Sequence, residues 1–520
     1  MSPNRRTSCT GLGVMLLAVL LAFSIPVVLQ AQTSSSRDAS KKPPASLTAA
    51  KSQLTHGDLQ GAETSLWSVL QSDPDNEEAL ILLGTIRGRQ QRFAEAEALF
   101  RRVLQINPKS VAAHRSLGKA LAVQDKVPEA IVQYKAAEAL SPHDDALKVE
   151  LARLYAGSGQ FEQAVTTLEG IPQARFPVEA IPVKAASLIA VGRKGDAIRL
   201  IEPAQGSPSA ELDLAQVFLD SKLPDEALRS LEMASTGFKR RPARFYYLKG
   251  RALATKGETG AAVAVLRQGL VEDPKSADVL VALAEIYSEE NKHNDAVAAL
   301  EKAQALNPDA LPVLRHLVVE ATKAGNRPAA LDAASALSDK SANNPDDLYL
   351  AGAAMLEQNV QGASMVLEKY VALRPDNAKA WMGLGIAYVQ QEHYAQARKP
   401  LERAIELDST LAEAEYQLGL VAKNEAKADE AIQHLQRALQ LQPRHAGALR
   451  TLGNLYLQSG NLEEARKALE SAEAIDPNNL QTEYDLGLVL NKLGKTELAR
   501  QHMERFRKLK EAQGPSDRHD

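Results

Sequence analysis

The sequence predicts an all-α protein, an α-solenoid of about fourteen helical hairpins. Hydrophobic residues make up 45% of the 520-residue chain and aromatic residues only 4%, so most apolar side chains are small or straight and suit close helix packing. One alanine recurs fourteen times at intervals of about 34 residues, a period typical of stacks in which each repeat buries its apolar face against its neighbours. The shortest interval lies between the fifth and the sixth of these alanines. The recurring alanines are Ala62, Ala96, Ala130, Ala164, Ala197, Ala227, Ala262, Ala296, Ala330, Ala363, Ala397, Ala431, Ala465 and Ala499.

Residues 1–31 are predicted to be a secretory signal peptide. Arg5 precedes an apolar run, and Ala31 offers a cleavage point before a polar tract. The alternative is an uncleaved anchor through residues 11–29, which nearly reach the roughly 20 residues needed to span a bilayer. Because Pro26 interrupts the run, cleavage is favoured. We expect an exported protein, periplasmic or associated with the outer envelope of a bacterium, or anchored in the inner membrane if the segment is retained.

The cysteine content and the charge of the chain exclude several classes of protein. The single cysteine, Cys9, precedes the apolar run, whereas a bacterial lipoprotein carries its lipid-bearing cysteine after it. Once residues 1–31 are removed, disulfides and thiolate metal sites are excluded, and a long cysteine-free exported chain favours a bacterial envelope. The net charge is −4, from 61 basic and 65 acidic residues, which does not indicate nucleic-acid binding. Residues 32–46 are a polar linker, and residues 511–520 are expected to be a disordered tail.

A single pattern of residue types runs through the repeats when the recurring alanine is numbered position 20. In the stretch 378–409, positions 4, 7, 8, 11, 20, 24 and 27 hold Trp381, Leu384, Gly385, Tyr388, Ala397, Leu401 and Ala404. Other repeats keep the phase, with Leu83, Gly84, Ala96, Phe100 and Pro108 near the start, then Leu117, Gly118, Ala130, Tyr134, Ala137 and Pro142, and later Leu418, Gly419, Ala431, Leu435, Ala438 and Pro443. Over about residues 43–510 the pattern resembles the tetratricopeptide repeat, a helix–turn–helix unit. The resemblance implies a right-handed superhelix.

Each position of the pattern has a physical reason. Positions 4, 7 and 11 form one apolar stripe on the first helix of a hairpin, and position 24 serves the second helix. Small residues at positions 8 and 20 let the two helices approach closely. Proline at position 32 ends the second helix, and a turn-forming residue often precedes it, as do Asp73, Asn107 and Asp476.

Two segments, about 170–242 and 335–375, match the repeat more weakly. The first contains the shortest interval and is crowded with Pro172, Pro177, Pro182, Pro203 and Pro208. These segments are either bends between better-packed blocks or the result of sequence drift in an intact stack. The sequence does not decide between the two.

The resemblance also implies that first helices line a concave groove through positions 2, 5, 6, 9, 12 and 13, where peptides or partner helices lie. In the early repeats this mapping gives a basic stripe suited to an acidic or C-terminal ligand, with solvated surface charge as the alternative. In the later repeats the mapped side chains are more apolar and aromatic, as in interface anchors. The basic stripe is Lys51, Arg89, Arg115, Lys119 and Arg153, interrupted by Glu150. The later set is Tyr349, Met382, Ile386, Tyr416, Leu420 and Tyr484, joined by Arg450 and Asn454, which suit a carboxylate clamp that Asp485 would oppose.

No sequence motif indicates catalysis. The G-x-x-x-x-G-K-[ST], H-E-x-x-H and G-x-S-x-G patterns do not occur. We therefore expect no enzyme activity, no catalytic residues, no cofactor and no metal. The predicted function is a protein–protein interaction scaffold of the cell envelope that binds other proteins or peptides, and not nucleic acid. Residues 11–29 would add a membrane tether if uncleaved. The alternative is a chaperone-like receptor for acidic or C-terminal segments.

Overall fold

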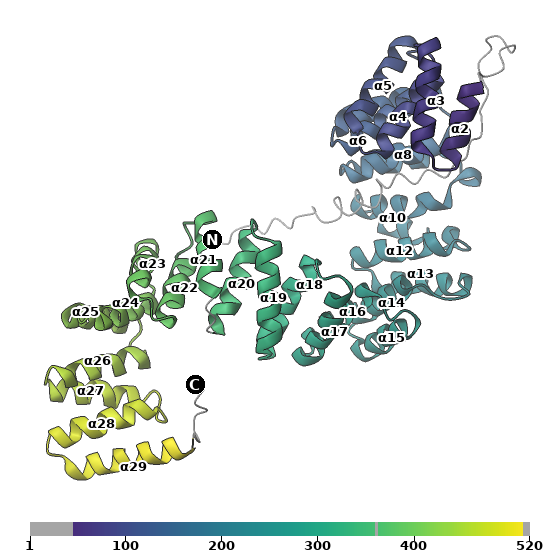
Figure 1. Cartoon of the computed structure of the whole chain (residues 1–520). Coiled ribbons are helices and arrows are strands. Elements are labelled where there is room, and N and C mark those ends of the chain that lie inside the picture. The colour runs from purple at the N-terminus through teal and green to yellow at the C-terminus, as the bar shows by residue number, and fades with distance from the viewer. Residues whose placement is uncertain (1–44, 359–361, 513–520) are drawn as a thin grey trace. The chain divides into compact units, whose positions relative to one another are not determined.

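The computed structural model describes residues 45–358 and 362–512, and Figure 1 shows them as helices joined by short turns. Throughout these residues the secondary structure is helical, with no strand, and the predicted all-α solenoid is confirmed. The predicted signal peptide, linker residues 32–44 and tail residues 513–520 lie outside the described part of the chain. Within that part, no helix combines the length and the apolar character needed to cross a bilayer.

The chain divides into two compact units, and the N-terminal unit is Met1–Pro274. Its described residues form seven hairpins, each a first helix followed by an antiparallel second helix. In chain order its helices are α2 (Ala45–Thr55), α3 (Leu59–Ser72), α4 (Glu77–Arg89), α5 (Phe93–Ile106), α6 (Val111–Val123), α7 (Val127–Leu140), α8 (Asp145–Gly157), α9 (Phe161–Glu169), the 3₁₀ turns η1 (Gln173–Arg175) and η2 (Val178–Ala180), α10 (Ile181–Ala190), α11 (Lys194–Ile198), η3 (Glu202–Ala204), α12 (Pro208–Asp220), α13 (Pro224–Gly237), α14 (Ala243–Thr255) and α15 (Thr259–Glu272).

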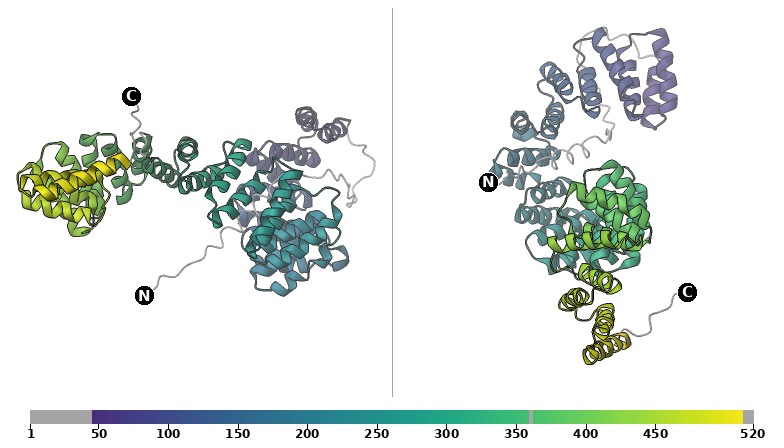
Figure 2. Two further views of the ribbon diagram at one scale, coloured as in Figure 1. Left: turned by 90° about the horizontal axis from the view of Figure 1, so that it is seen from below. Right: turned by 90° about the vertical axis from the view of Figure 1, so that its left-hand side faces the viewer.

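The C-terminal unit, Lys275–Asp520, repeats the arrangement with seven further hairpins in its described residues. Figure 2 shows two further views of these stacked helix pairs. The helices of the C-terminal unit are α16 (Ala277–Glu289), α17 (His293–Leu306), α18 (Leu311–Lys323), α19 (Arg327–Lys340), α20 (Pro345–Glu357), α21 (Gly362–Leu373), α22 (Ala378–Gln390), α23 (Tyr394–Leu407), α24 (Ala412–Asn424), α25 (Ala428–Leu441), α26 (Ala446–Gln458), α27 (Leu462–Glu473), α28 (Leu480–Lys492) and α29 (Thr496–Ala512).

The recurring alanine lies at the contact between the two helices of every hairpin. All fourteen alanines are at most 5% exposed. Position 8 of the first helix, glycine in seven repeats and alanine in six with Val318 as the exception, lies across this contact. A Cβ added there would come 2.4 Å from Leu401 at Gly385 and 2.6 Å from Leu469 at Gly453. A larger side chain would therefore push the helices apart, which explains why the repeat keeps both positions small.

The turn inside each hairpin uses a left-handed residue at position 15. Thirteen of the fourteen repeats have a positive φ there, and Gln358 is the exception with φ −88°. A left-handed residue ends the first helix and reverses the chain within three residues. The thirteen are Gly57, Gln91, Asp125, Gly159, Gly192, Lys222, Gly257, Asn291, Gly325, Glu392, Ala426, Gly460 and Gly494.

The proline-crowded part of the N-terminal unit is shortened but packed. α9 has 9 residues and α11 only 5, and 3₁₀ turns replace the missing helix. One buried cluster nevertheless runs through this part, from Val165 through Ile181 and Leu188 to Phe218 and Phe245. The stack therefore keeps a continuous apolar core across its shortest repeats.

First helices line the inner side of each stack. Neighbouring first helices contact each other, as α4 does α6 and α12 does α14 in the N-terminal unit, and as α20, α22, α24, α26 and α28 do in series in the C-terminal unit. Second helices of neighbouring hairpins contact each other less. A stack built in this way is concave on the side of its first helices, and the predicted binding residues lie on these helices.

Candidate functional site

The basic stripe lies on first helices of the N-terminal unit, where α2, α4, α6 and α8 carry it. Lys51, Lys119 and Arg153 hold position 9 of their repeats, and Arg115 and Arg89 hold positions 5 and 13. All five are half-buried. The fold therefore places all five on first helices, and that they line a binding groove stays a prediction.

Acidic partners within the unit neutralise much of this stripe. Glu150 takes the central place, because its carboxylate accepts from Arg115 at 2.7 and 2.8 Å and pairs with Lys119 at 3.0 Å. The hydrogen bond and charge of Glu150 raise the pKa of Arg115. Lys51 forms an ion pair with Glu78. An incoming acidic ligand would have to displace carboxylates that are already in place.

Arg89 and Arg153 are the two members of the stripe without a carboxylate partner in the described structure, and Arg153 is held only weakly. One of its terminal nitrogens donates to the carbonyl of Glu179 at 3.3 Å, while its Nε is buried without a hydrogen-bond partner in the described structure. An incoming acceptor would therefore meet Arg89 and the terminal nitrogens of Arg153 without first displacing a carboxylate.

The later candidate residues form two regular rows on the first helices of the C-terminal unit. Position 5 holds Met382, Tyr416, Arg450 and Tyr484 on α22, α24, α26 and α28, one in each successive repeat. Position 9 holds Ile386, Leu420 and Asn454 on the first three of these helices, followed by Leu488 on α28. All eight side chains are partly exposed. We call this surface the ladder; Tyr349, at position 6 of α20, precedes it.

Neighbouring rings hold the aromatic members of this surface in place. The Tyr416 ring lies 4.6 Å from that of His445, and the Tyr484 ring lies 5.3 Å from that of Phe506. Tyr349 packs in the same way at 5.2 Å from Tyr370. A ring that is already fixed loses little conformational entropy on binding, which favours its use as an anchor.

A small polar network interrupts the ladder at α26. Asn454 accepts a hydrogen bond from Lys423 Nζ at 3.3 Å, and burial, together with the nearby charge of Arg450, lowers the pKa of that lysine. Asp485 is 2% exposed, and burial raises the pKa of its carboxyl. Two cations thus face one buried acid. Lys423 was missed from the sequence, although it holds position 12, one of the expected groove positions.

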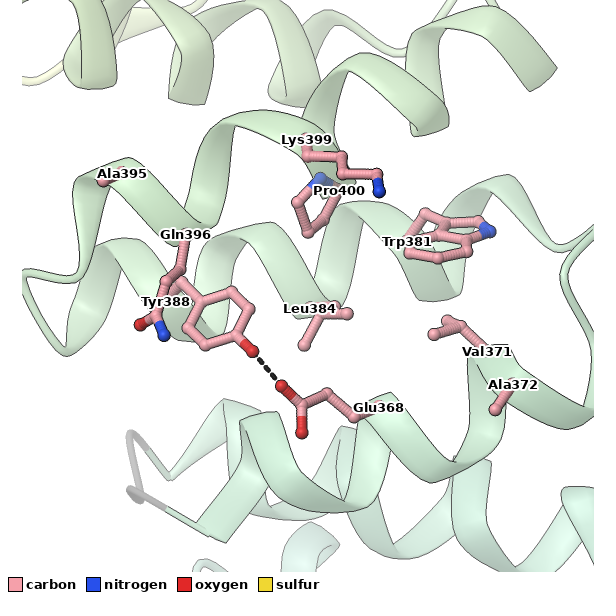
Figure 3. Close-up of a pocket in the computed structure, with 10 residues that line it drawn as sticks. All are labelled: Glu368, Val371, Ala372, Trp381, Leu384, Tyr388, Ala395, Gln396, Lys399 and Pro400. Carbon is pink, nitrogen blue, oxygen red and sulfur yellow. Dashed lines mark hydrogen bonds between the residues drawn. The ribbon is translucent and has the colours of Figure 1, made fainter.

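An open pocket of about 480 Å³ lies away from the ladder, between the second helices α21 and α23 and over α22 (Figure 3). Trp381 and Tyr388, two positions of the apolar stripe, face it. The Trp381 indole donates to the carbonyl of Pro375 at 2.9 Å, and Tyr388 donates to Glu368. Burial and that hydrogen bond raise the pKa of Tyr388 to about 12. Both rings thus serve the packing of three helices as well as the pocket wall.

Pro400 forms part of the wall of this pocket. It lies inside α23, where proline removes one helical hydrogen bond and its ring displaces the preceding turn. Pro400 occupies position 23, which faces Trp381 at position 4. The sequence shows a proline at a helical repeat position, but whether a pocket forms beside it depends on how the neighbouring helices pack.

Comparisons with known proteins match the repeat pattern over most of the chain. One family model described as Tetratricopeptide repeat matches residues 124–180, 253–320, 354–423 and 425–485. A second model of the same description matches residues 47–111, 83–145 and 212–277. The shortened repeat around α10 and α11 falls between these matches.

Curated relatives match about half of the chain. Cellulose synthase operon protein C of Escherichia coli (strain K12) is 28% identical over 283 residues, which are 50% of this chain and 23% of that protein. The protein of the same name in Pseudomonas fluorescens (strain SBW25) is 25% identical over 293 residues, or 51% of this chain and 20% of the relative. The match therefore spans less than a quarter of these relatives.

Solved structures with related architecture include a chain of the APC/C hetero-tetramer Cut9-Hcn1. It is 16% identical with a TM-score of 0.39, covering 89% of this chain and 92% of that one. MamA is 26% identical with a TM-score of 0.29, covering 31% of this chain and 95% of its own. Both TM-scores are low, so neither structure bears on function.

Proposed function

Because the chain belongs to the tetratricopeptide repeat family, whose domains generally bind other proteins or peptides, we propose that it is a non-enzymatic scaffold of the bacterial cell envelope. It assembles or tethers partner proteins through the inner, first-helix surface of its stack. The observation that carries the proposal is the ladder, in which partly exposed side chains recur at the same two positions of successive repeats along α22, α24, α26 and α28. A partner that follows the ladder would meet apolar or aromatic contacts on α22, α24 and α28 and polar groups on α26.

The chemistry of the ladder favours a protein segment with apolar side chains and some polar groups. Met382, Ile386 and Leu420 supply apolar contact, and Tyr416 and Tyr484 combine an apolar ring with a polar tip. Hot spots of protein interfaces are enriched in tyrosine and arginine, and the ladder includes Arg450 among its tyrosines. An extended segment or a helix laid across several repeats would cover these groups together.

An affinity purification of the full-length tagged chain from membrane extracts tests this proposal. The double variant Tyr416→Ala/Tyr484→Ala should lower the yield of co-purified protein roughly tenfold or more. Each lost tyrosine should cost about 1 kcal/mol or more of binding free energy, and the two losses multiply in the affinity. The matched control, Met365→Ala/Leu498→Ala, removes side chains that are 61% and 48% exposed on second helices. Equal yields from the ladder variant and the parent, or steady turnover of a substrate by the purified chain, would overturn the proposal.

The envelope location rests on the N-terminal apolar segment, with support from the curated relatives. Their names place them in cellulose synthase operons, so proteins of a polysaccharide-synthesis assembly are the first partners to test. Fractionation of cells followed by N-terminal sequencing checks the location. A periplasmic protein beginning near Gln32 is expected, and the full-length chain in the cytoplasm would contradict the assignment.

The alternative, a receptor for acidic or C-terminal segments, has one observation in its favour, the unsatisfied Nε of Arg153. Against it stands the pairing of Arg115 and Lys119 with Glu150. Binding of a short acidic peptide that is lost in Lys119→Glu/Arg153→Glu would support this alternative. If the peptide still bound after both changes, the basic stripe would be excluded as its binding site.

A further inference from the structure

Three potential metal ligands meet where the last hairpin packs on the one before it. Glu473 ends α27, Glu483 lies in α28, and His502 lies in α29. One ligand atom from each lies within 4.8 Å of the other two. His502 Nδ1 is 2.7 Å from Glu483 Oε2 and 3.9 Å from the Glu473 carboxylate. Within residues 45–358 and 362–512, this is the one group of three such side chains with that geometry.

The combination of these three residues can be compared with the residues at the same positions one and two repeats earlier. One repeat earlier they hold Leu439, Leu449 and Ala468, all apolar. Two repeats earlier they hold Ile405, Glu415 and His434, and His434 Nδ1 again lies 2.7 Å from the glutamate. The glutamate–histidine pair thus occurs twice. At the earlier pair Glu430 Oε1 also lies 3.9 Å from His434 Nε2, but a carboxylate at the position of Glu473 occurs only at the last junction among these three repeats.

The buried oxygen of Glu483 is the second observation that indicates a ligand. Glu483 is 1% exposed, and its Oε1 accepts no hydrogen bond in the described structure. Arg505 Nη1 lies 3.8 Å from Glu483 Oε1, too far for a hydrogen bond. A buried carboxylate oxygen without a partner is costly, and a metal ion would satisfy it.

We propose that Glu473, Glu483 and His502 bind a divalent transition-metal ion of the Zn²⁺ class and that the ion fastens α29 to the stack. Two carboxylate oxygens and one imidazole nitrogen suit Zn²⁺, whereas Mg²⁺ prefers oxygen ligands alone. Ligand atoms around a tetrahedral Zn²⁺ lie roughly 3.3 Å apart, so small side-chain rotations complete the site. Three helices would then share one ion.

Arg505 is the competitor for this site. Its Nη1 lies 2.8 Å from the Glu473 carboxylate, where it supplies part of the positive charge that the ion would bring. The Arg505 side chain is 62% exposed, so it can move into solvent when the ion binds. Removing this guanidinium should therefore strengthen metal binding.

The experiment measures Zn²⁺ binding to the full-length chain after treatment with a chelator. Isothermal titration with ZnCl₂ should give one ion per chain at this site and a higher Tm, and MgCl₂ should give neither. Glu473→Gln and His502→Gln should each weaken Zn²⁺ binding by at least roughly 10–100-fold. That range is the cost of losing a residue that only hydrogen-bonds to a metal ligand, and a direct ligand should cost no less. Arg505→Ala should tighten it.

The earlier glutamate–histidine pair supplies the matched control. Glu415→Gln and His434→Gln should leave the stoichiometry and affinity unchanged, while Ile405→Glu should create a second site by adding the missing carboxylate. Circular dichroism identifies any variant that fails to fold, and Glu473→Gln, at a partly exposed helix end, is the safest of them. Absence of Zn²⁺ binding, or binding indifferent to Glu473→Gln and His502→Gln, would reduce the cluster to an ion-pair network and overturn the proposal.

Discussion

Asp347 shows what a single buried charge does in this stack. It holds position 4, which is apolar in seven of the fourteen repeats, at the start of α20, and it is 2% exposed. Arg315 of α18 donates to it at 2.8 Å, and Ser341 donates as well. These bonds outweigh the cost of burial and lower the pKa of Asp347 below its usual value. The charged pair thus joins two neighbouring repeats.

We predict that Arg315→Ala lowers the free energy of unfolding of the C-terminal unit by roughly 1.5–3 kcal/mol at neutral pH, the range for hydrogen bonds to charged groups. The control, Arg403→Ala, removes an exposed pair with Glu406 and should change stability by less than about 1 kcal/mol. Urea unfolding of the two variants and the parent measures both effects.

The sign of the pH dependence follows from the direction of the Asp347 shift. Because the folded-state pKa is depressed, the stabilisation is fully present above the unfolded-state pKa and is lost as pH falls through the folded-state pKa. The difference between Arg315→Ala and the parent should therefore be constant from neutral pH down to about 4 and shrink below it. A difference that grows on acidification would contradict the assignment of the pair.

The sequence predicted the repeat positions of individual residues but not the contacts of their side chains. The repeat phase placed Lys119 and Tyr416 on first helices, because a nearly constant period fixes which helix each position occupies. It did not predict that Glu150 holds both Arg115 and Lys119, since those contacts depend on rotamers and on how α6 and α8 pack. For the same reason no sequence pattern indicated a metal site, because its three residues lie on three helices.

At the scale of the helical hairpin, the left-handed turn residue can be tested in isolation. Gly460 has φ +82°, and a Cβ added there would meet nothing within 4 Å, so only backbone strain opposes a larger residue. Gly460→Ala should destabilise the protein by about 1 kcal/mol, as the left-handed strain of about 1–2 kcal/mol is partly offset by the lower entropy of the unfolded chain. Thermal unfolding measures the change.

Two substitutions act as controls for this turn. Ala426 has φ +60° at the same position of its hairpin, so Ala426→Gly should be neutral or stabilising. Gly195 lies inside α11 with equally open surroundings, and Gly195→Ala should stabilise that helix by about 0.5–1 kcal/mol. If Gly460→Ala were as stabilising as Gly195→Ala, the turn would not need the left-handed conformation.

Helix boundaries were predictable where a local rule decides them. Asp73 and Asn107 before proline indeed follow the last residues of α3 and α5. The length of α11 was not predictable, because the short interval shows that residues are missing without showing which turn of helix is lost. Pro400 is the opposite case, since α23 continues through it where a local rule would end the helix. Packing on α22 and α21 overrides the local preference there.

At the scale of the whole molecule, the period alone predicted the architecture, because a repeat that cannot bury its apolar face alone must stack. The division into two units at Pro274 has no counterpart in that period, which continues from Ala262 to Ala296 without change. Stability in such a stack is carried by contacts between neighbouring repeats, so a local defect should act locally. The two units are therefore expected to unfold in separate transitions.

The two tryptophans allow this expectation to be measured, because Trp67 lies in the N-terminal unit and Trp381 in the C-terminal unit. Leu117 and Leu418 both hold position 7 of their repeats and are each 1% exposed, so their truncation to alanine should cost about 2–5 kcal/mol. In a Trp381→Phe background, Leu117→Ala should shift the urea transition seen by Trp67, and Leu418→Ala should leave it in place. In a Trp67→Phe background the effects should reverse. If each truncation shifted both transitions equally, the fourteen repeats would form one cooperative block. Only complete coupling would let Leu117→Ala in the third repeat change the unfolding that Trp381 reports in the eleventh.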